Sequence, residues 1–156
     1  IVVDVNPAPG PGYNDIDITQ TVPRDVVMIP LGTTDLSRAA SLAVAYSALA
    51  NGSMVSVVKP DKVIYTTSRE EAEEHILNPV EGEISYANLE AGLAGSRRPL
   101  NIVIVTENDP GLLDYLSSRI RLHDRISVVY TGRGEFSSNA RTYKLQNLDG
   151  LRGLRL

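Results

Sequence analysis

The stretch Val26-Val27-Met28-Ile29-Pro30-Leu31-Gly32-Thr33-Thr34-Asp35 decides the fold. Its first six residues form a continuous apolar run, which is typical of a strand buried on both faces. The small and polar residues that follow favour a turn. Beyond them, apolar residues recur at helical spacing as far as Leu49, in an Ala-rich composition that favours a helix. The stretch therefore predicts a buried strand, a tight turn and a long helix.

The same alternation continues along the chain. Ser68 and Glu71 form a capping-box pattern that predicts a helix ending near Leu77. Further strands are expected at residues 55–58, 62–66, 101–105 and 126–130, and further helices around residues 86–93, from Asp109-Pro110 onward and over residues 137–145. Short apolar strands that alternate with helices predict a Rossmann-like three-layer α/β domain with a mainly parallel central sheet.

The two ends of the chain have a different character from the middle. Residues 7–12 read Pro-Ala-Pro-Gly-Pro-Gly, which excludes a helix or a central strand. We therefore expect residues 1–24 to be an N-terminal strand or arm with a Pro/Gly linker, and residues 25–147 to be the Rossmann-like domain. Residues 148–156 form a tail that we expect to fray or to dock on a partner.

Composition excludes several classes of protein. The chain has 156 residues, 42% of them hydrophobic, which is enough for one domain with a core. Because it has no cysteine and two histidines, a disulfide scaffold, a thiolate nucleophile and a zinc finger are excluded, and we expect no cofactor. No apolar run is long enough to span a bilayer. We expect a soluble, cytoplasmic protein without a membrane partner.

The charges are unevenly distributed. The net charge of −4 argues against general nucleic-acid binding, which needs a broad cationic surface. Residues 1–96 carry a net charge of −8 and residues 97–156 a net charge of +4. Twelve of the fifteen cations are arginine, which suits recognition of phosphate or carboxylate. This asymmetry is compatible with a solvated basic face, with an anion site or with a surface for self-association.

Four predicted strand ends carry hydroxyl or glycine residues beside a charge. In open parallel sheets, ligands bind beyond the carboxyl ends of the strands, where helix N-termini favour anions. The same residue types are also ordinary helix caps and turn residues, so a purely structural role without ligand binding is left open. The expected ligand-binding residues are Gly32, Thr33, Thr34, Thr67, Thr131, Gly132, Arg133 and Gly134.

Signals of catalysis are weaker. Asp35, Glu107, Asp109 and Glu135 could converge on Mg²⁺, although nothing in their spacing requires it. Gly132-x-Gly134 lacks the third glycine of a dinucleotide loop. Arg69 and His75 have a spacing found in some ribonuclease helices, which we attribute to coincidence. Whether the protein is an enzyme is left open.

Taken together, the order of these segments resembles the CRISPR-associated Rossmann fold (CARF) family of nucleotide sensors over about residues 25–145. The resemblance rests on residues 29–34, on Pro60-Asp61-Lys62-Val63 with its strand, and in part on residues 130–135. It implies a homodimer that holds a cyclic oligoadenylate, which some members cleave without a metal. Arg133, Gly134 and Glu135 depart from the Thr-Gly-Gly-Thr-Lys pattern of the family. Either Arg133 takes over the role of the phosphate partner, as we expect for a sensor, or the protein does not bind the family's ligand in the family's way.

We carry three hypotheses forward from the sequence. The first is a homodimeric sensor of a nucleotide-type anion. The second is a phosphodiesterase or a metal-assisted hydrolase on the same fold. The third is an interaction module of a larger assembly, to which the start at Ile1 rather than at Met adds weight.

Overall fold

The computed structural model describes residues 2–4 and 24–153. Their strands form one seven-stranded sheet in the order β1-β7-β6-β5-β2-β3-β4. All neighbouring strands are parallel except the β3–β4 pair, which is antiparallel. The strands are β1 (Val2–Asp4), β2 (Asp25–Pro30), β3 (Val55–Val58), β4 (Val63–Thr66), β5 (Leu100–Thr106), β6 (Arg125–Tyr130) and β7 (Arg141–Lys144).

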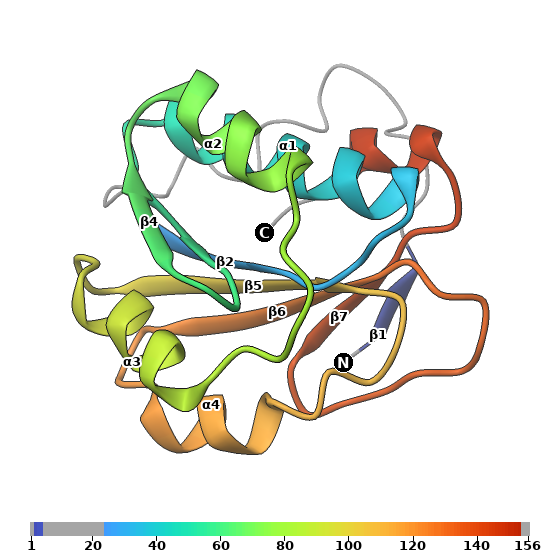
Figure 1. Cartoon of the computed structure of the whole chain (residues 1–156). Coiled ribbons are helices and arrows are strands. Elements are labelled where there is room, and N and C mark those ends of the chain that lie inside the picture. Colours follow the sequence, from blue (N-terminus) through green and yellow to red (C-terminus); the bar gives the residue numbers. More distant parts are fainter. Residues whose placement is uncertain (1, 5–23, 154–156) are drawn as a thin grey trace.

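Helices cover both faces of this sheet, so the predicted Rossmann-like three-layer α/β architecture is confirmed (Figure 1). One face carries α1 (Asp35–Ala50) and α2 (Arg69–Leu77), and we call it the α1 side. The other carries α3 (Tyr86–Ala94) and α4 (Leu113–Arg119), and we call it the α4 side. None of the helices in the described residues is both long enough and apolar enough to cross a membrane.

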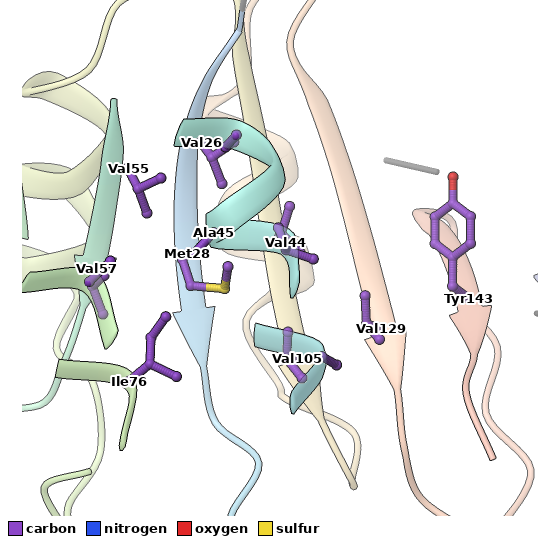
Figure 2. Close-up of a cluster of buried hydrophobic side chains, with 14 of the residues drawn as sticks. Val26, Met28, Val44, Ala45, Val55, Val57, Ile76, Val105, Val129 and Tyr143 are labelled. Atoms are coloured by element: carbon purple, nitrogen blue, oxygen red, sulfur yellow. The ribbon is translucent and has the colours of Figure 1, made fainter. Parts of the chain in front are cut away.

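Two hydrophobic clusters follow from the pleat of the central strands. Alternate residues of a strand point to opposite faces, so Met28 and Val103 join the cluster on the α1 side, whereas Ile29 and Ile104 join the cluster on the α4 side. Figure 2 shows the first cluster, in which Val44 of α1 packs over the strands. The continuous apolar runs seen in the sequence are therefore strands buried on both faces.

The antiparallel β4 corrects one expectation about the site. Thr66 of β4 pairs with Val55 at the start of β3, and Val55 in turn pairs with Val26 near the start of β2. The carboxyl end of β4 therefore lies at the amino edge of the parallel strands. Thr67, which follows it, lies at the opposite edge from the ends of β2, β5 and β6, so the expectation that four strand ends share one edge is wrong for this one.

One predicted helix is a strand, and another begins later than predicted. Residues 137–145 contain the strand β7 instead of a helix, and Thr142 and Tyr143 within it are buried. Helix α4 begins at Leu113, and its N-cap position, Leu112, makes no side-chain cap bond. Asp109 instead accepts a hydrogen bond from the N–H of Gly111, whose φ is +67°. An Asx turn therefore takes the place of the predicted N-cap.

The described parts of both chain ends belong to the same domain. Val2–Asp4 pairs in parallel with β7 as the edge strand β1, whereas the Pro/Gly segment lies outside the described residues. The tail forms a 3₁₀ helix, η2 (Leu148–Gly153), and Leu151 packs against the cluster on the α1 side. This part of the tail therefore docks on its own domain rather than fraying.

The contact between α3 and the sheet yields a stability prediction. A Cβ atom at Gly92 would lie 2.7 Å from Cγ2 of Val58 and 3.3 Å from Cγ1 of Val27, both buried. We expect Gly92→Val to lower the free energy of unfolding by about 1–3 kcal/mol, because overpacking must shift the helix or the strands. Urea unfolding measures this change.

Ala94→Val, at an exposed position of the same helix, is the matched control. It should cost no more than about 0.7 kcal/mol, the difference in helix propensity. Equal losses for the two variants would contradict the close contact at Gly92.

Candidate functional site

Three strand ends meet at the carboxyl edge of the sheet. In the sheet, β3 lies on one side of β2 and β5 lies on the other, followed by β6. The direction in which the chain adds strands therefore reverses between β2 and β5. Such a switch point is where open α/β sheets bind ligands. The N–H groups of Leu31 and Gly32 donate to the carbonyl oxygen of Val105, and the N–H of Thr131 donates to that of Thr106, each at 2.9 Å. The loops after β2, β5 and β6 are therefore adjacent.

The carboxylate of Glu107 lies at the N-terminus of α1. Its Oε1 atom accepts hydrogen bonds from the backbone N–H groups of Thr33, at 2.8 Å, and Thr34, at 2.7 Å. Thr34 is the N-cap of α1, and its hydroxyl oxygen accepts from the N–H of Ser37. The partial positive charge of this helix end is thus met by a negative group of the chain itself.

Ser37 connects the three loops through its hydroxyl group. Its Oγ atom lies 2.6 Å from Oγ1 of Thr131, 3.2 Å from Oγ1 of Thr34 and 3.3 Å from Oε1 of Glu107. Ser37 is only 1% exposed, so these contacts replace water as its hydrogen-bond partners. We call the group formed by Gly32, Thr33, Thr34, Ser37, Glu107, Thr131 and Gly132 the strand-end cluster.

Two glycines permit the close approach of these loops. A Cβ atom at Gly32 would lie 2.1 Å from Oγ of Ser37, and one at Gly132 would lie 2.2 Å from the carbonyl oxygen of Glu107. Both distances are far inside a van der Waals contact. Glycine is needed at these positions because of their neighbours, a requirement that neither turn alone would impose.

The hydrogen bonds at Glu107 set its protonation. Partial burial raises the pKa of the Glu107 carboxyl, but hydrogen bonds from the backbone N–H groups of Thr34 and Thr33 and from nearby hydroxyls outweigh it. The net effect is a pKa below the ordinary value for glutamate. Glu107 is therefore a carboxylate at neutral pH and acts here as an acceptor.

The structure brings most of the expected binding residues together. Gly32, Thr33, Thr34, Thr131 and Gly132 belong to the strand-end cluster. Arg133 and Gly134 continue the loop after β6 and are exposed. Thr67 lies at the other edge of the sheet, as the register of β4 requires.

The cations at this edge differ in their partners. In the described part of the chain, Arg133 makes no hydrogen bond or ion pair. Lys144, at the end of β7, lies 3.3 Å from Glu135. Lys144 pairs in register with Tyr130, the residue just before the loop that carries Arg133. Within the described residues, the carboxyl edge therefore offers the guanidinium of Arg133 without a partner, and a second cation, Lys144, on the neighbouring strand.

The acidic residues considered as metal ligands have separate partners. Asp35 lies 3.6 Å from Arg38, Asp109 accepts from the N–H of Gly111, and Glu135 pairs with Lys144. Within residues 2–4 and 24–153, no group of three or more Asp, Glu or His side chains could hold a metal ion. Arg69 and His75 also have different partners. The guanidinium of Arg69 stacks over the ring of Tyr46, whereas Nδ1 of His75 lies 3.4 Å from Nζ of Lys59.

No known family model and no curated protein matches this chain. Oε1 of Glu107 is fully engaged, whereas no hydrogen bond in the described residues engages Oε2. The strand-end cluster thus presents an acceptor beside several hydroxyls, and Arg133 presents donors.

Sequence reasoning missed Ser37 and the role of Glu107. Ser37 starts the buried face of α1, which continues through Ala40, Ser41 and Val44, so a polar residue at the head of an apolar stripe was the available signal. Glu107 follows the buried strand β5 directly, but its contact with residues 33 and 34 spans more than 70 positions. Nothing local in the sequence predicts that contact.

The charge of Glu107 yields a prediction about stability and pH. Because its pKa is lowered in the folded protein, ionised Glu107 stabilises the fold at pH values above the unfolded pKa of about 4.3, and this contribution is lost as the pH falls through the folded pKa. We expect Glu107→Gln to lower the free energy of unfolding by about 1–2 kcal/mol at pH 7. The difference from the unmodified protein should shrink below about pH 4.

Urea unfolding at several pH values measures this difference. Glu83→Gln, at an exposed position without a hydrogen bond or ion pair in the described residues, is the control and should change stability by less than about 0.5 kcal/mol. A Glu107→Gln effect that is negligible at pH 7, or that grows on acidification, would contradict the placement of Glu107.

Proposed function

We propose that this domain binds a nucleotide-type anionic ligand at the carboxyl edge of its sheet and acts as a sensor of that ligand. The observation that carries the proposal is the meeting of the loops after β2, β5 and β6 at the switch point. Thr33, Glu107 and Thr131 lie there within one hydrogen-bonded cluster. Hydroxyls, a carboxylate oxygen and an arginine without an ion-pair partner among the described residues are groups that suit a ribose and a phosphate.

The strand-end cluster and Arg133 suit different chemical groups of the proposed ligand. Since the carboxylate of Glu107 already occupies the N-terminus of α1, a phosphate at that position would face a like charge. A ligand hydroxyl suits this position better, because it can donate to Oε2 of Glu107. The phosphate then belongs farther out on the edge, where Arg133 offers a planar fork of N–H donors.

The resemblance to CARF sensors leads to a more specific form of the proposal. In that form, two copies of the chain meet at this edge and hold a cyclic oligoadenylate between them. The exposed positions of Thr33 and Arg133 at the carboxyl edge support it, since both would be accessible to a second copy. A homodimer also presents two arginines to a ligand that carries several phosphates.

Isothermal titration with cyclic oligoadenylates of different ring sizes tests the proposal. We expect binding with heat, and a loss of about 1.5–3 kcal/mol in Arg133→Ala because a charge-assisted hydrogen bond is removed. Arg121→Ala is the matched control, because Arg121 is also exposed but lies at the amino edge, where its backbone N–H bonds Asp124. It should leave the affinity unchanged.

The choice of ligands makes the result specific. Linear oligoadenylates and mononucleotides in the same titration separate a preference for the ring from recognition of any nucleotide. Equal weakening by Arg133→Ala and Arg121→Ala would indicate general charge attraction and contradict a site at the carboxyl edge. No heat with any nucleotide at micromolar protein would overturn the proposed function.

A further inference from the structure

The sheet ends on one side at β4. This strand pairs with β3, and among the described residues no further strand lies beyond it (Figure 1). Helix α2 packs near β4 on the α1 side, and α3 packs near it on the α4 side. The two faces of β4 are therefore covered by helices, whereas its outer edge has no strand partner in the described part of the chain.

The turn between β3 and β4 determines which backbone groups face this outer edge. The N–H of Lys59 donates to the carbonyl oxygen of Lys62 at 2.9 Å, so these two residues form a hydrogen-bonded pair. Hydrogen-bonded and non-hydrogen-bonded pairs alternate along an antiparallel ladder, so Ile64 bonds β3 through its backbone. The N–H and C=O groups of Val63 and Tyr65 therefore point away from β3.

These outward groups have no hydrogen-bond partner within residues 2–4 and 24–153. The phenol of Tyr65 donates to the carbonyl oxygen of Ala91 in α3, but the residue as a whole is 42% exposed. The loop from α2 to α3 contacts the hairpin at its turn, where a Cβ atom at Gly82 would lie 3.5 Å from Cβ of Pro60. A strand edge with unpaired N–H and C=O groups is a template for pairing with another strand.

The sequence of β4 does not protect this edge. Natural sheets block an exposed edge with charged side chains, with proline or with a bulge. Residues 63–68 read Val-Ile-Tyr-Thr-Thr-Ser, without a charge, a proline or a glycine. β-branched and aromatic residues of this kind fit a pleated, paired strand. The edge is therefore suited to an uncharged strand as its partner.

A second copy of β4 fits this edge in antiparallel register. If Ile64 lies opposite Ile64 of the second copy, Val63 of each copy lies opposite Tyr65 of the other. Residues opposed in this way exchange both N–H···O bonds, because their backbone groups all point outward. Val63 and Tyr65 lie on the α4 side and Ile64 on the α1 side, so apolar cross-strand pairs form on both faces. Lys62 lies opposite Thr66, so no like charges oppose each other.

We propose that two copies of this chain join through β4, in an antiparallel register centred on Ile64, so that their sheets become one continuous sheet. This pairing needs no ligand and uses no residue of the strand-end cluster. It is separate from the ligand-dependent pairing at the carboxyl edge, so either contact can fail without the other.

Backbone amide hydrogen exchange of the full chain tests the pairing at the residues concerned. We expect exchange at Val63 and Tyr65 to slow about tenfold or more between low and high micromolar protein, because association shields these amides. The amide of Ile64 bonds β3 within one copy and should change much less. Exchange at Val63 and Tyr65 that does not depend on concentration overturns the proposal: fast exchange means an open edge, and slow exchange means an edge covered within one copy.

A proline variant tests the hydrogen bonds of the edge. Val63→Pro removes an outward N–H and no bond to β3, at the kind of position where edge strands tolerate proline. Val63→Ala also shortens the side chain but keeps the N–H, so it is the matched control. Sedimentation equilibrium at high micromolar protein should show a monomer for Val63→Pro and a dimer for Val63→Ala.

Arg133→Ala separates this contact from the proposed ligand site. Without ligand it should dimerise like the unmodified protein, even though it loses affinity for the nucleotide. Equal association of folded Val63→Pro and Val63→Ala would refute pairing through β4. If Val63→Pro does not fold, the exchange measurement on the unmodified chain decides the question.

Discussion

The carboxyl edge of this domain depends on one contact, in which the carboxylate of Glu107 accepts hydrogen bonds from the backbone N–H groups of Thr33 and Thr34. The N–H groups at a helix N-terminus need acceptors, and here the acceptor comes from the end of a neighbouring strand. Hydrogen bonds to a charged group contribute about 1.5–3 kcal/mol each, which is considerable beside a total stability of about 5–15 kcal/mol. The contact also joins β2, α1 and β5 where the strand order reverses.

For the proposed ligand site, the same contact determines which chemical groups this edge would favour. An empty helix N-terminus attracts phosphate, but this one already has a negative partner. The remaining features are Oε2 of Glu107, to which no hydrogen bond within residues 2–4 and 24–153 is directed, the hydroxyls of Thr33 and Thr131, and the guanidinium of Arg133. They favour a ligand whose hydroxyl groups approach the cluster while its anionic groups stay on the outer edge, which is the arrangement a nucleotide offers.

The sequence predicts those parts of the fold that local chemistry determines. The apolar run of β2, the Ala-rich face of α1 and the Ser68 cap of α2 can each be recognised within a few residues, and the structure has all three. The capping box is only half formed, since the hydroxyl of Ser68 accepts from the N–H of Glu71 while the N–H of Ser68 donates to Thr66. Local patterns therefore predicted the elements better than the bonds within them.

The errors have a common physical cause, which is that strand pairing is decided at long range. Residues 141–144 form a strand because β6 offers them a free edge, although their own pattern permits a helix. The direction of β4 follows from the tight turn at residues 59–62, which sends Thr67 to the other edge. The contact of Glu107 with α1 is of the same kind, so the candidate site could be located from the sequence but its occupant could not.

An NMR titration of the side-chain carboxyl carbon of Glu107, together with the amide signals of Thr33 and Thr34, tests the central claim most directly. If the carboxylate holds these two amides, Glu107 titrates below the ordinary glutamate range, and both amide signals shift with the same midpoint. A Glu107 carboxyl that titrates at its ordinary pKa while the two amides stay unchanged would contradict the account.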